Sequence, residues 1–139
     1  MSINILVIDG QGGGMGSRLV ENIKKAYPQV IVGAVGTNAL ATQAMLKAGA
    51  DHGATGENAV VVGCRNADII VGPVGIVIAD SLWGEITPAM AVAVGQSSAA
   101  RILLPVNQCC NIIAGASDIP NGKLIQYALE EIEKVLENK

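Results

Sequence analysis

The chemistry that this sequence offers is concentrated in one run near its start, Asp9-Gly10-Gln11-Gly12-Gly13-Gly14-Met15-Gly16. Glycines lack a Cβ atom, so the backbone can turn sharply here and approach a ligand closely. The run follows an apolar stretch, residues 3–8, that predicts a buried strand, and a helical pattern begins directly after it. The free N–H groups and the dipole at a helix N-terminus favour an anion, most often a phosphate. We therefore expect a nucleotide or another phosphate-bearing small molecule at this loop, although a tight turn that only packs a helix on a strand would use the same glycines.

Asp9 gives the loop a charge that a bound phosphate would have to accommodate. A carboxylate at the strand end repels phosphate unless it is protonated, turned away or bridged by Mg²⁺. It could instead accept N–H groups of the loop and hold the turn closed. Nothing in strand packing requires a carboxylate at this position, so we expect Asp9 to matter more for function than for stability.

Two further loops are expected beside the glycine loop. Dinucleotide-binding folds often place an acidic residue after the second strand, where it binds the ribose hydroxyls, but this chain has Thr37 and Asn38 there. These neutral groups would not repel a 2′-phosphate, so NADP is preferred over NAD if either binds, although no Arg stands nearby. Alternatively, Thr37 and Asn38 only cap the following helix. A later strand end is expected to add three more ligand-facing residues, Gly72, Pro73 and Gly75.

The other reactive side chains form no complete catalytic constellation, so whether the chain is an enzyme stays open. His52, the only histidine, is expected on the surface. Carboxylates on loops or element starts, such as Glu57, Asp80 and Glu85, are usually solvated or capping. One hypothesis still gives Asp9, Glu57 or Asp80 a Mg²⁺-dependent role on a phosphorylated substrate. The three cysteines, Cys64, Cys109 and Cys110, form neither a metal-binding pattern nor a disulfide framework.

Length and composition indicate one domain, residues 1–139, with an aliphatic core. Half of the residues are apolar, only 2% are aromatic and none is Phe, which suits a parallel sheet buried on both faces. A net charge of −3 without a basic patch argues against a nucleic-acid partner. No segment predicts a membrane span or a signal peptide, so we expect a cytoplasmic protein with reduced thiols. The mean hydropathy of +0.44 is high for this length and favours a homo-oligomer.

Alternating aliphatic runs and helical patterns predict a Rossmann-like three-layer α/β/α domain with a mostly parallel sheet. In residues 57–66 the run of three valines favours a strand, but the order of elements favours a helix, which we prefer. About five residues separate a strand at 102–106 from the apolar run 112–114, too few for a parallel crossover, so an antiparallel last strand is expected. The remaining strands are expected at 3–8, 30–35 and 69–71, with a very short strand followed by a turn within residues 50–56. The helices are expected at 15–27, 39–48, 57–66, 87–96 and 122–137.

Part of the chain is similar to the Rossmann half of short-chain dehydrogenases. Gly10 and Gly14-Met15-Gly16 match the spacing of their TGxxxGxG loop, with Asp9 in place of Thr. Residues 67–76 resemble a strand end of the same superfamily, but Gly72-Pro73 stand where two Asn are expected. Those enzymes also need a Tyr-x-x-x-Lys pair, and neither tyrosine of this chain has a Lys four residues on. A reductase of that type is therefore not expected.

As a whole, the sequence resembles an uncharacterised bacterial family of domains of unknown function. Its members open with an IDGQGGGxG loop and carry GTNALAT, GATGEN, GPxGI and GEITPAMA segments. Here these are residues 8–16, 36–42, 53–58, 72–76 and 84–91. The resemblance implies a Rossmann-like fold and no known activity. The leading hypothesis is a small nucleotide-binding protein or enzyme, and the alternative is a regulatory or interaction module that keeps the fold without the ligand.

Overall fold

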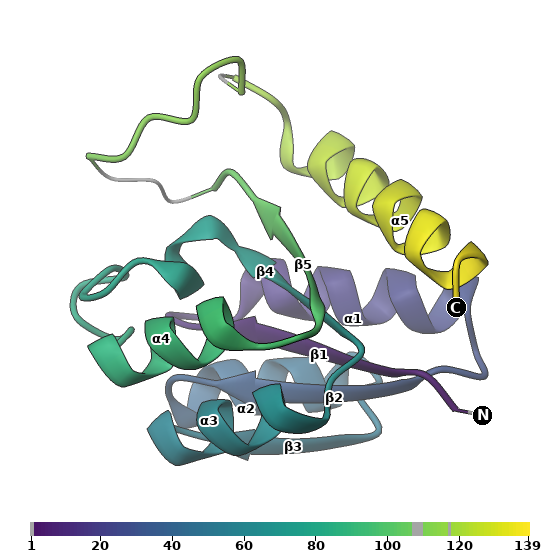
Figure 1. Ribbon diagram of the computed structural model, residues 1–139, viewed down its shortest axis with the longest axis horizontal. Helices are drawn as coiled ribbons and strands as arrows, with labels where there is room; N and C mark the ends of the chain where they lie inside the picture. The colour runs from purple at the N-terminus through teal and green to yellow at the C-terminus, as the bar shows by residue number, and fades with distance from the viewer. Residues whose placement is uncertain (1, 107–109, 117) are drawn as a thin grey trace.

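A five-stranded parallel sheet in the order β3-β2-β1-β4-β5 forms the centre of the protein (Figure 1). The computed structural model describes residues 2–106, 110–116 and 118–139. All of the strand pairings in this sheet are parallel, and helices cover both of its faces, which confirms the Rossmann-like α/β fold. The strands are β1 (Asn4–Asp9), β2 (Ile31–Gly36), β3 (His52–Thr55), β4 (Ile69–Pro73) and β5 (Ala100–Leu104).

Two hydrophobic clusters, one on each face of the sheet, bury the alternate side chains of the strands. On β1, Ile5 and Val7 belong to one cluster, whereas Leu6 and Ile8 belong to the other. The first cluster packs against α1 (Gly14–Ala26), α2 (Ala39–Lys47) and α5 (Asn121–Glu137). The second packs against α3 (Glu57–Asn66), the 3₁₀ helix η1 (Val74–Val77) and α4 (Pro88–Gln96).

Side chains cap the starts of two helices, at Asn38, where the sequence allowed a cap, and at Thr87. Asn38 caps α2 by accepting the N–H of Ala41 at 2.9 Å, and Thr87 caps α4 by accepting the N–H of Met90 at 3.2 Å. The ambiguous residues 57–66 form a helix, because Val60 and Cys64, one turn apart, both point into the core.

The expected antiparallel last strand is wrong for the described residues. Residues 110–116 form turns and irregular chain instead of a strand, and the side chain of Ile112 is 91% exposed. The apolar run 112–114 therefore belongs to the connection between β5 and α5, and Figure 1 shows this described part of it outside the sheet, beyond β5. β5 also begins two residues earlier than expected, because a strand at the edge of the sheet tolerates the exposed Arg101.

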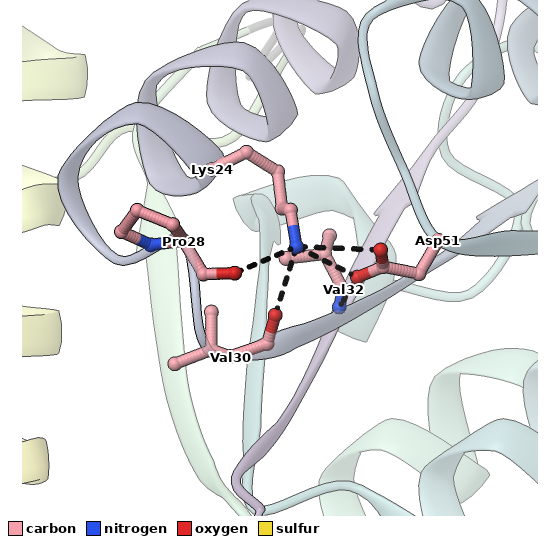
Figure 2. A network of polar contacts seen from close by, with 5 residues as sticks. All are labelled: Lys24, Pro28, Val30, Val32 and Asp51. Atoms are coloured by element: carbon pink, nitrogen blue, oxygen red, sulfur yellow. Dashed lines mark hydrogen bonds and ion pairs between the residues drawn. The ribbon is translucent and has the colours of Figure 1, made fainter.

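Lys24 links the C-terminal part of α1 to the residues around the start of β2 and β3, and Figure 2 shows its polar contacts. Its ammonium donates to the carbonyl oxygens of Pro28 at 3.3 Å and Val30 at 3.0 Å, and it pairs with the carboxylate of Asp51 at 3.0 Å. Asp51 also accepts the N–H of Val32 at 2.8 Å. The hydrogen bond from Val32, with further help from Lys24, lowers the pKa of Asp51. One carboxylate thus joins α1, β2 and the start of β3.

Replacing Asp51 by Asn should lower the free energy of unfolding by about 1 kcal/mol at pH 7, because charge-assisted hydrogen bonds are lost. Since the folded pKa of Asp51 lies below the unfolded value of about 3.9, this stabilisation is present above that pH and is lost as the pH falls through the folded pKa. Denaturant unfolding at pH 7 and at about pH 3 measures both effects. Lys134→Ala, which breaks the exposed Lys134–Glu131 pair, is the control and should cost less than about 0.5 kcal/mol. A loss at pH 7 no larger than that of the control would contradict the assignment.

Candidate functional site

The loop between β1 and α1 is closed by the carboxylate of Asp9. This side chain is only 4% exposed, and it accepts the N–H of Gly10 at 2.8 Å and the N–H of Gly16 at 2.6 Å. A Cβ atom on Gly16 would lie 2.7 Å from the Cβ of Asp9, so the contact requires glycine there. Burial raises the pKa of Asp9 although the two hydrogen bonds lower it, and the charge of Glu85 adds to the rise. The sequence left open whether Asp9 faces a ligand or accepts N–H groups of the loop. In the structure it accepts two such N–H groups and holds the turn closed.

The first turn of α1 offers backbone donors that the described residues do not use. Gly13 enters the helix with a left-handed φ of 72°, and its N–H donates to the carbonyl oxygen of Gly10 at 2.9 Å. The N–H groups of Gly12, Gly14 and Met15 have no hydrogen-bond partner in the described part of the chain. Unpaired donors at the positive end of a helix dipole are the groups that attract an anion.

These donors border a cavity of about 670 Å³ between the glycine loop and the connection from β5 to α5. That volume lies within the range of small-molecule sites, about 300–1,000 Å³. The far wall includes Val106, Ile112 and Ile119, and Asn121 at the start of α5. α5 lies along α1, and both helices begin at this end of the molecule, so two helix dipoles direct their positive ends toward the cavity (Figure 1). Among its described lining residues, only Asp9 and Asp118 carry a charge.

The structure brings together part of the expected site. Seven of the eight residues of the glycine run, from Asp9 to Met15, line the cavity, and Gly16 is buried beneath them. Gly72 contacts the neighbouring strand, since a Cβ there would collide with the carbonyl oxygen of Ile8. Whether any of these residues touches a ligand stays a prediction. Besides Gly16, the expected site residues outside the cavity wall are Thr37, Asn38, Gly72, Pro73 and Gly75.

Thr37 and Asn38 instead contact Glu85, which sequence reasoning placed among the solvated or capping carboxylates. Glu85 Oε1 accepts the N–H of Gln11 at 2.8 Å, the hydroxyl of Thr37 at 2.5 Å and the amide of Asn38 at 3.2 Å. Burial pushes the pKa of Glu85 up, but the three hydrogen bonds outweigh it and lower the pKa below its ordinary value. A single carboxylate therefore bridges the glycine loop and the loop after β2. No local signal marks this role, because Gln11 lies 74 positions away in the sequence.

The remaining reactive groups lie apart from the cavity. His52 and Asp80 are exposed, and Glu57 accepts the hydroxyl of Thr87 at 2.6 Å. Burial raises the pKa of the Cys64 thiol to about 11, which suits a small core residue, whereas Cys110 is exposed. Cys109 lies outside the described residues. Within the described ranges, no group of three His, Cys, Asp or Glu side chains could hold a metal ion.

Comparison with known sequences assigns the chain to a family. The family described as a domain of unknown function, DUF3842, matches residues 4–137. The chain belongs to this family. The resemblance inferred from the sequence is thus confirmed. None of the curated proteins matches this DUF3842 chain. Across the described residues, the DUF3842 domain has no helix that is long and apolar enough to cross a membrane.

Among solved structures, the DUF3842 chain is similar to a nucleoside-diphosphate-sugar epimerase from Pseudomonas aeruginosa, with 15% sequence identity and a TM-score of 0.48. The likeness covers 99% of this chain and 49% of the epimerase chain, so the DUF3842 domain spans about half of that length. A likeness of this degree carries no argument about what the domain binds.

Replacing Asp9 by Asn should lower the free energy of unfolding by about 1–2 kcal/mol, because Asn keeps one acceptor oxygen and turns an NH₂ group toward a backbone donor. Since the folded pKa of Asp9 is raised, its contribution is fully present below the unfolded pKa of about 3.9 and declines as the pH rises through the folded pKa. The loss in the free energy of unfolding that Asp9→Asn causes should therefore become smaller as the pH rises. The loss caused by Asp51→Asn should instead become larger as the pH rises. Denaturant unfolding from about pH 4 to pH 8 measures it, with the exposed Asp80→Asn as a control that changes little. A loss in the free energy of unfolding that grows with pH would contradict the raised pKa of Asp9.

Proposed function

We propose that this DUF3842 protein binds a phosphate-bearing small molecule, in the first place a nucleotide, at the N-terminus of α1. The observation that carries the proposal is the set of unpaired N–H groups on Gly12, Gly14 and Met15 at the edge of the cavity. A phosphate group accepts several such hydrogen bonds at once and gains from the helix dipole. The alternative, a module that keeps the fold without a ligand, predicts no binding at all.

The walls of the cavity suit a ligand that carries a phosphate group and is otherwise largely uncharged. Val106, Ile112 and Ile119 supply apolar surface, and the side chain of Asn121 adds a polar group. No Lys or Arg stands among the described lining residues, so the backbone dipoles of α1 and α5 would supply the attraction. The carboxylates of Asp9 and Asp118 oppose it. A Mg²⁺ ion that accompanies the ligand, as nucleotides commonly carry, would offset these two charges.

Three finer points belong to the same proposal. NADP, which the sequence favours because Thr37 and Asn38 are neutral, is one candidate nucleotide, although Glu85 places a carboxylate against both residues. Cytoplasmic residence, expected from the composition, stays a prediction. We also propose that the protein assembles with further copies of itself, because large apolar side chains of the described residues are more than half exposed, namely Leu40, Trp83, Val92 and Ile112.

Gly14→Val should abolish phosphate binding and leave the fold intact. Nothing lies within 4 Å of the place where a Cβ on Gly14 would stand, and its φ is outside the left-handed region. The valine side chain would cover the donors of the first turn, so affinity should fall at least about tenfold, a loss of about 1.4 kcal/mol. Calorimetric titration with NADP, NAD, ATP and coenzyme A, with and without Mg²⁺, measures the loss.

Gly95→Val is the matched control for this experiment. Gly95 is exposed in α4, and a Cβ there also meets nothing within 4 Å. This variant makes the same Gly-to-Val change in a helix, which helix propensity does not disfavour, and should bind as the wild type does. Wild-type protein that binds none of the nucleotides, or a Gly14→Val variant that binds normally, would overturn the proposal.

A further inference from the structure

Parallel α/β sheets bind ligands in a crevice at the C-terminal ends of their strands. In this protein, residues 80–86 occupy the part of that crevice beside β2. In dinucleotide-binding folds the ligand crosses the glycine loop, and the ribose of one half lies at the end of the second strand. Here Glu85 takes the donors at that place, because its Oε1 accepts from Gln11, Thr37 and Asn38. Leu82, 2% exposed, fills the space next to Gly10, where an added Cβ would lie 3.0 Å from the Leu82 Cδ1.

Hydrogen bonds and buried side chains hold residues 80–86 in place within the fold. The N–H of Asp80 donates to the carbonyl oxygen of Ile86 at 2.7 Å, and the hydroxyl of Ser81 donates to the carbonyl oxygen of Gly75 at 2.5 Å. Leu82 and Ile86 are both buried in the cluster beneath α4. The left-handed φ angles of Asp80 (67°), Leu82 (56°) and Trp83 (56°) are disfavoured for residues with a Cβ, so these contacts must hold the segment in place.

We propose that residues 80–86 close the β2 half of the crevice, so that the site takes a mononucleotide or a similarly small phosphorylated compound and excludes dinucleotides. This inference rests on the proposed function of the glycine loop. The open cavity lies on the β5 side of the loop, and Glu85 and Leu82 are not part of its wall. Glu85 also supplies a carboxylate at the end of β2 from a distant part of the chain. Its charge would repel a 2′-phosphate, which removes the ground for preferring NADP.

The test compares each dinucleotide with its own halves on the wild-type protein. The probes are NAD, NADP, AMP, adenosine 2′,5′-bisphosphate, nicotinamide mononucleotide and inorganic phosphate, titrated by calorimetry. We expect the better half to bind at least as tightly as the dinucleotide that contains it. NAD or NADP binding at least tenfold tighter than both of its halves would overturn this inference and leave the proposed function standing. Failure of every probe, inorganic phosphate included, would overturn the proposed function and this inference with it.

Two variants test the same point from the side of the protein. Glu85→Ala and Leu82→Ala each remove a side chain that occupies the crevice beside β2. The readout is the ratio of the dinucleotide Kd to the mononucleotide Kd. A loss of affinity that both ligands share cancels in this ratio. The ratio should shift at least tenfold toward the dinucleotide in at least one of them. Trp83→Ala, a change on the same segment at a side chain that is 94% exposed, is the control and should keep the wild-type ratio. If both Glu85→Ala and Leu82→Ala keep the wild-type ratio of the two Kd values, the inference is overturned.

Discussion

The buried carboxylate of Asp9 is the constraint on which the rest of the site depends. It holds the N–H groups of Gly10 and Gly16, so it fixes both ends of the turn between β1 and α1. α1 packs into the core through Leu19 and Ile23. This packing and the hydrogen bonds of Asp9 together fix the position of its first turn. The two N–H groups also offset the charge of a carboxylate that would otherwise repel a phosphate. These two hydrogen bonds let a carboxylate lie beneath the proposed anion site.

Glu85 applies the same principle to the other side of the loop. It satisfies the N–H of Gln11 and joins that residue to Thr37 and Asn38. Between them, the two carboxylates use the donors on the inner side of the turn, and only those that border the cavity remain unpaired within the described structure. The positions of two acidic side chains therefore decide which donors stay available to a ligand, and on which side of the loop.

Much of the fold could be predicted because its signals are local. Aliphatic runs mark the central strands, since a parallel sheet is buried on both faces, and Asn38 and Thr87 mark helix starts by their own hydrogen bonds. The position of Asp9 at the end of β1 was equally visible. The failure at residues 112–114 has a physical reason: an apolar run reports hydrophobicity and not pairing, and here it borders a cavity outside the sheet. Glu85 could not be found because its partners are distant in sequence and the left-handed residues before it decide where it points.

The amide resonances of Gly12, Gly14 and Met15 offer the most direct test of phosphate binding at α1. Two-dimensional ¹⁵N–¹H correlation spectra of the wild-type protein, recorded during a titration with AMP, report on every assigned N–H group separately. Binding at the unpaired donors predicts that these three resonances move most, while the amide of Val32 at the opposite edge of the sheet stays in place. Spectra that do not change, or whose largest changes fall on Thr37 and Asn38 instead, would contradict the site.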